Sequence, residues 1–155
     1  MVHRWRWGIH LRFGLATTLL ALGRDAEALA QADEGLPHAV ATNSRKYVGW
    51  FHAIRGEVAL RAGDTTAAMT ELQHALTEAR AIGYPTLTWQ AAHLLAQAER
   101  AAGQIEEAWA SVCVAHQMIQ QIAAASPADD LAKTLMAWPR VMAALETYRE
   151  LERGK

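Results

Sequence analysis

Seven histidines are the residues of this sequence best suited to metal binding or to acid–base chemistry. They are His3, His10, His38, His52, His74, His93 and His116. None lies in a His-Glu-x-x-His pattern, which would place two imidazoles and a carboxylate on one helix face. His52 and His93 are the candidate metal-binding pair, and Glu57 is the candidate third ligand. These three residues are more simply explained as part of the lining of a polar groove, so the sequence predicts no metal site.

One thiol and one pair of acids are the remaining candidates for catalysis. Cys113 has no neighbouring cation in the sequence to lower its pKa, which favours an inert thiol. Asp129 and Asp130 are adjacent, so their side chains point to different sides of a helix. Acids in the first turn of a helix are stabilised by the helix dipole, which accounts for both residues without catalysis. The sequence contains neither a Gly-x-Ser-x-Gly elbow nor a phosphate-binding loop. It therefore predicts a protein that is not an enzyme and that holds no cofactor.

The N-terminal segment is the one locally basic and aromatic part of the chain. Arg4-Trp5-Arg6-Trp7 is followed by Arg12, and no acid precedes Asp25. Stacking of bases on the tryptophans would make this segment a nucleic-acid site, but the net charge of -1 offers no general attraction to phosphate. A first helix with an uncovered apolar face is the favoured interpretation. We expect Trp5 and Trp7 to form an N-terminal interface with an upstream domain or a second copy.

The composition favours helices that pack closely. Among 155 residues there are 33 alanines, 10 glycines and 4 prolines, and 52% of the residues are hydrophobic. No apolar run is long enough to cross a bilayer, and the start of the chain does not resemble a signal peptide. The single cysteine cannot form an internal disulfide. We therefore predict one all-α domain in the cytoplasm.

Three glycines divide the chain at a constant interval of 40 residues. They are Gly23, Gly63 and Gly103, and an alanine stands five residues after each, at Ala28, Ala68 and Ala108. Apolar residues three and four apart on both sides of each glycine predict a helix pair. Pro37 predicts a kink or an early end of its helix. The predicted single domain, 1–155, comprises repeat 1 at about 5–42, repeat 2 at about 43–83, repeat 3 at about 84–125 and capping helices at 126–153.

Helix pairs with a small residue, a glycine, an acid and then that alanine resemble the tetratricopeptide repeat family. The period of 40 is longer than the ~34 residues usual in that family. Together with Ser44-Arg45-Lys46-Tyr47 and Pro85-x-x-x-Trp89, it resembles the C-terminal repeats of bacterial maltose-regulator-type (LuxR-family) activators and of related ATPase or adenylate cyclase signalling proteins. The resemblance implies a right-handed helical solenoid. It also implies a C-terminal part, or a truncated relative, of a larger signalling protein or transcription regulator.

In such a solenoid the first helices of the pairs would line a concave groove. Aligning the three glycines places six residues there, Phe13, Thr17, Glu57, His93, Gln97 and Arg100. The resemblance implies a non-catalytic interaction scaffold or sensor, with a protein or peptide partner in the groove. A sensor that binds a small-molecule effector is the first alternative. Nucleic-acid binding through the basic N-terminus is a weaker one, and no membrane partner is expected.

Overall fold

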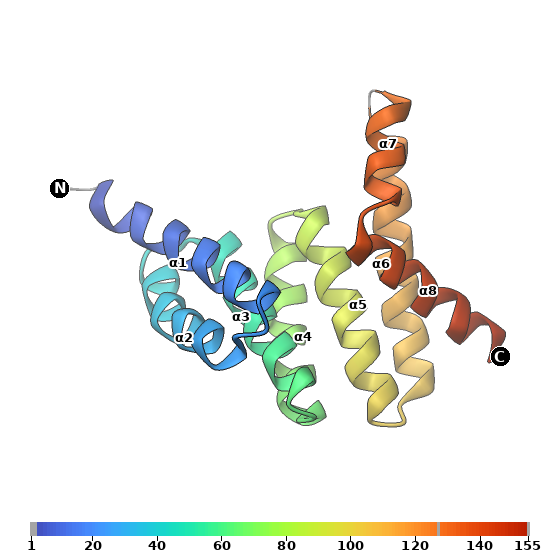
Figure 1. The fold of residues 1–155 in the computed structure, drawn as a ribbon, viewed down its shortest axis with the longest axis horizontal. Coiled ribbons are helices and arrows are strands. Elements are labelled where there is room, and N and C mark those ends of the chain that lie inside the picture. The colour runs from blue at the N-terminus through green and yellow to red at the C-terminus, as the bar shows by residue number, and fades with distance from the viewer. Residues whose placement is uncertain (1–2, 127, 155) are drawn as a thin grey trace.

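The computed structural model describes the backbone of residues 3–126 and 128–154, and the side chains from residue 8 onward within those ranges. These residues form α-helices and no strand, which confirms the predicted all-α class. The helices are α1 His3–Ala21, α2 Asp25–Ala41, α3 Arg45–Arg61, α4 Thr65–Ala81, α5 Pro85–Ala101, α6 Ile105–Ala124, α7 Asp129–Met136 and α8 Pro139–Arg153. Helices adjacent in the chain pack in pairs, which follow one another along the molecule (Figure 1).

The turns that join α1 to α6 share one backbone geometry. A residue with positive φ occurs every 20 residues, with Gly23 at 71°, Asn43 at 51°, Gly63 at 81°, Gly83 at 60° and Gly103 at 79°. The next amide bonds to the carbonyl five residues back, as from Asp64 to Ala59 at 2.9 Å. This pattern is the Schellman turn, which ends a helix through one left-handed residue. The interval of 40 in the sequence thus spans two equal units, each a helix and a short turn.

Small residues allow the paired helices to approach closely. Ala28, Ala68 and Ala108 are completely buried. A Cβ atom on Gly56 would lie 2.5 Å from Cγ of Leu72 on the facing helix, so α3 and α4 are in contact at this point. The core therefore depends on backbone proximity as well as on large side chains.

The helix that contains Pro37 does not end there. α2 continues to Ala41, so the alternative of an early end is wrong, and the alternative of a kink stays a prediction. A proline removes one helical donor, here the amide that would bond to the carbonyl of Asp33. Pro37 is exposed, on the side of the helix where water can bond to a carbonyl that has lost its donor.

The last two helices pack against the third helix pair. α7 lies along the end of the long helix α6, and α8 packs against α6 and α5 (Figure 1). Val141 and Ala144 of α8 join the main core, and Leu151 packs with Val112 of α6. This placement brings the first turn of α8 within reach of α3, where Arg140 bonds to Glu57. Among the described helices, none has the length and apolar character needed to span a bilayer.

Candidate functional site

Two adjoining hollows lie along α1, α3 and α5, and we call them together the groove. The larger, of about 350 Å³, is mainly apolar and includes Phe13, Trp50, Leu94 and Trp138 in its lining. The smaller, of about 270 Å³, has polar and apolar surface in similar amounts and is lined by side chains of α3, α5 and α8. Its polar residues are Glu57, Arg61, Gln90, His93, Gln97 and Arg140. The groove thus offers an apolar wall beside a charged one.

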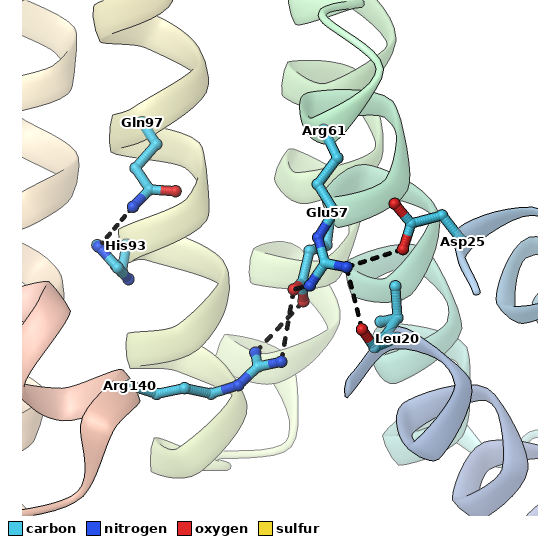
Figure 2. A network of polar contacts seen from close by, with 7 residues as sticks. All are labelled: Leu20, Asp25, Glu57, Arg61, His93, Gln97 and Arg140. Carbon is cyan, nitrogen blue, oxygen red and sulfur yellow. Dashed lines mark hydrogen bonds and ion pairs between the residues drawn. The ribbon is translucent and has the colours of Figure 1, made fainter. Parts of the chain in front are cut away.

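Glu57 is the central charged residue of the groove, and it lines both hollows. Its side chain is only 11% exposed, so its carboxylate needs partners to offset the loss of hydration. Arg61, one helical turn away on α3, donates from Nη2 to Oε1 at 2.6 Å. Arg140 of α8 donates to Oε2 at 3.3 Å and to Oε1 at 3.4 Å (Figure 2). Two cations from different elements therefore meet at one buried acid.

Arg61 also links α3 to the first helix pair. Its Nη1 donates to the backbone carbonyl of Leu20 at 3.0 Å and to Oδ1 of Asp25 at 2.8 Å (Figure 2). Leu20 lies near the end of α1, and Asp25 begins α2. The guanidinium is thus shared between Glu57 and the α1–α2 turn, and its position is set by both.

His93 is buried at the α8 side of the smaller hollow, where 7% of its surface is exposed. Gln97 donates from its amide nitrogen to Nε2 at 3.0 Å, and Oγ1 of Thr147 lies 3.2 Å from the same atom. The pKa of His93 is lowered to about 4, mainly by burial and to a lesser extent by the charge of Arg140, while the charge of Glu57 opposes the shift. The imidazole is consequently neutral near pH 7.

The structure places five of the six predicted groove residues along the two hollows. Phe13 and Thr17 line the larger, His93 and Gln97 line the smaller, and Glu57 lines both. Their role in binding remains a prediction. Arg100, the sixth, lines neither hollow and pairs with Glu150 of α8 at 2.6 Å. The side chains of Trp5 and Trp7 lie outside the described residues, so the predicted N-terminal interface stays a prediction.

Two charged groove residues are absent from the sequence prediction. Arg61 follows Glu57 by four residues, and this helical spacing was a signal that could have identified it. Arg140 gives no such signal, because it is 83 residues from Glu57 and belongs to a helix outside the repeats.

His52 and His93 have different surroundings. His52 bonds to Glu71 of α4 at 2.6 Å and stacks on His74 with ring centroids 5.1 Å apart. His93 instead faces Thr147 of α8. Within the described residues, no group of three or more His, Cys, Asp or Glu side chains is arranged to hold a metal ion.

The sequence matches no protein-family model, and no curated protein is significantly similar to it. The resemblance to tetratricopeptide repeats therefore rests on the residues and spacing of this chain alone.

Proposed function

We propose that this chain is a non-catalytic peptide-binding module built as a tetratricopeptide-like solenoid. The observation that carries the proposal is the groove itself, an open apolar surface with one buried carboxylate at its middle. Binding sites of this kind use the apolar wall for affinity and a few fixed polar groups for orientation. The first helices α1, α3 and α5 supply that surface, as they do in peptide-binding helical repeats.

A row of aromatic side chains supports recognition of a peptide. The ring centroids of Phe13 and Trp50 are 5.3 Å apart, and those of Trp50 and Tyr84 are 6.3 Å apart. The ring centroids of Phe13 and Tyr47 are 5.7 Å apart. Rings that already pack on one another lose little conformational entropy when a partner covers them. Phe13 and Trp50 keep part of their surface in the larger hollow, where a partner side chain can pack.

A small-molecule effector is the second candidate. The larger hollow, at about 350 Å³, has a volume within the range of ligand sites and has charged groups at one end. Such an effector would raise the melting temperature by mass action. A metabolite that stabilises the wild type and fails to stabilise a variant with a filled hollow would favour this candidate.

Selection of random 12-residue peptides displayed on phage tests the proposed function. Ala21 is exposed and lines the larger hollow, so Ala21→Trp should fill it. Ala30 is an exposed alanine of α2 outside both hollows, and Ala30→Trp is the matched control. We expect selected peptides to bind the wild type and Ala30→Trp equally, and Ala21→Trp at least tenfold more weakly. Peptides indifferent to both substitutions, or no selected peptide at all, would contradict the proposal.

A further inference from the structure

The Glu57–Arg140 ion pair lies at the border between the two hollows. Both residues line each hollow. Arg140 is the second residue of α8, and its side chain extends toward α3 to reach Glu57 (Figure 2). The ion pair therefore divides the groove, and a peptide that lies along both hollows has to displace Arg140.

The two members of this ion pair differ in how firmly they are held. Glu57 is 11% exposed and bonds to Arg61 at 2.6 Å. Arg140 is 43% exposed, and its bonds of 3.3 and 3.4 Å are longer than the 2.7–2.9 Å typical of charge-assisted hydrogen bonds. An exposed arginine can return to water with little loss of free energy, whereas a buried carboxylate cannot. Arg140 is thus the exchangeable member.

The charges around Glu57 indicate which side chain can take the place of Arg140. Asp25 and Glu57 balance Arg61 and Arg140, and these ion pairs form one network. Arg61 alone cannot compensate both acids, because its guanidinium is shared with Asp25 and with a backbone carbonyl. A cation from a partner restores the balance when Arg140 leaves. A partner carboxylate would instead add a third negative charge.

On the basis of the proposed peptide-binding function, we infer that the groove selects a partner segment in which an arginine or lysine neighbours an aromatic or aliphatic residue. The basic side chain replaces Arg140 at Glu57. The apolar side chain fills the larger hollow against Phe13 and Trp50. Arg140 then acts as an internal competitor that occupies the acidic site of the free protein.

The direction in which Arg140→Ala changes affinity separates this inference from the alternative that Arg140 itself binds an acidic peptide. Selected peptides are synthesised with a fluorescent label and titrated against the full chain. We expect them to be basic and to bind Arg140→Ala about two- to sixfold more tightly, since removal of a weak competing ion pair frees the site. We expect at least tenfold weaker binding to Glu57→Gln, which leaves the partner cation unpaired. The matched control is Arg149→Ala, an exposed arginine of α8 outside the groove, and it should leave affinity unchanged.

A second measurement separates charge recognition from a change in groove shape or in the packing of α8. Each peptide is also made with its basic residue replaced by glutamine. The replacement should weaken binding to the wild type and should not weaken binding to Glu57→Gln, because in that variant the cation has already lost its partner. Circular dichroism of each variant verifies that the helices persist.

Three outcomes would overturn the inference or its basis. Acidic peptides that lose binding to Arg140→Ala would make Arg140 an anion receptor. They would overturn the inference while leaving the peptide-binding function intact. Peptides that lose affinity for Ala21→Trp but bind Glu57→Gln as tightly as the wild type would also overturn the inference and leave the peptide-binding function intact. Failure of every selected peptide to respond to Ala21→Trp would overturn the proposed function itself.

Discussion

Replacement of glycine by alanine at Gly63 and at Gly14 should change stability in opposite directions. Gly63 has a φ of 81° in the turn between α3 and α4, whereas Gly14 lies inside α1. A Cβ atom added to either residue meets no other atom within 4 Å. The two substitutions therefore differ in backbone conformation and involve no steric clash with a neighbour.

The magnitudes follow from that difference. A side chain in the left-handed region destabilises the folded state by about 1–2 kcal/mol. The same substitution lowers the conformational entropy of the unfolded chain, which stabilises the folded state by about 0.4–1 kcal/mol. Gly63→Ala should thus lower the free energy of unfolding by about 1 kcal/mol. Gly14→Ala should raise it by about 0.5–1 kcal/mol, because alanine is the better helix former. For a chain of this size, 1 kcal/mol corresponds to a change in melting temperature of about 2–4 °C.

Urea denaturation followed by circular dichroism at 222 nm measures both changes. The urea concentrations at the midpoints should shift in opposite directions, while the slope of the free energy of unfolding against urea concentration stays the same. If Gly63→Ala leaves stability unchanged or increases it, the turn does not require a left-handed residue. The equal spacing of the turns would then need another explanation.

Two further predictions concern buried residues. His93 is neutral when folded because burial lowers its pKa from 6.5 to about 4. Because the unfolded chain takes up this proton near pH 6.5 and the folded chain only near pH 4, the free energy of unfolding is unaffected above pH 6.5. It falls by about 3 kcal/mol as the pH is lowered to 4. His93→Gln should remove that part of the pH dependence in denaturation series between pH 7 and pH 4.5, and identical slopes in the two proteins would contradict the assignment. Ala68 is completely buried in the main core, so Ala68→Glu should unfold the chain or lower its melting temperature strongly. An unchanged thermal transition would place Ala68 outside the core.

The sequence by itself determined the helices and most of the turns, because both depend on local properties. Alanine-rich segments with apolar residues three and four apart favour helices wherever they fold. A left-handed turn residue is a property of one position, and glycine identifies it at Gly23, Gly63 and Gly103. The equal unit of 20 residues is less evident, because Asn43 performs the same role without being a glycine.

The tertiary structure alone decided which charged residues meet in the groove. Glu57 could be placed on the inner side of its helix from the repeat register, and Arg61 could have followed from helical spacing. Arg140 could not, since α8 lies outside the repeats and its position depends on packing against α5 and α6. An ion pair between residues 83 positions apart depends on where complete helices come to lie, and no local pattern encodes that distance.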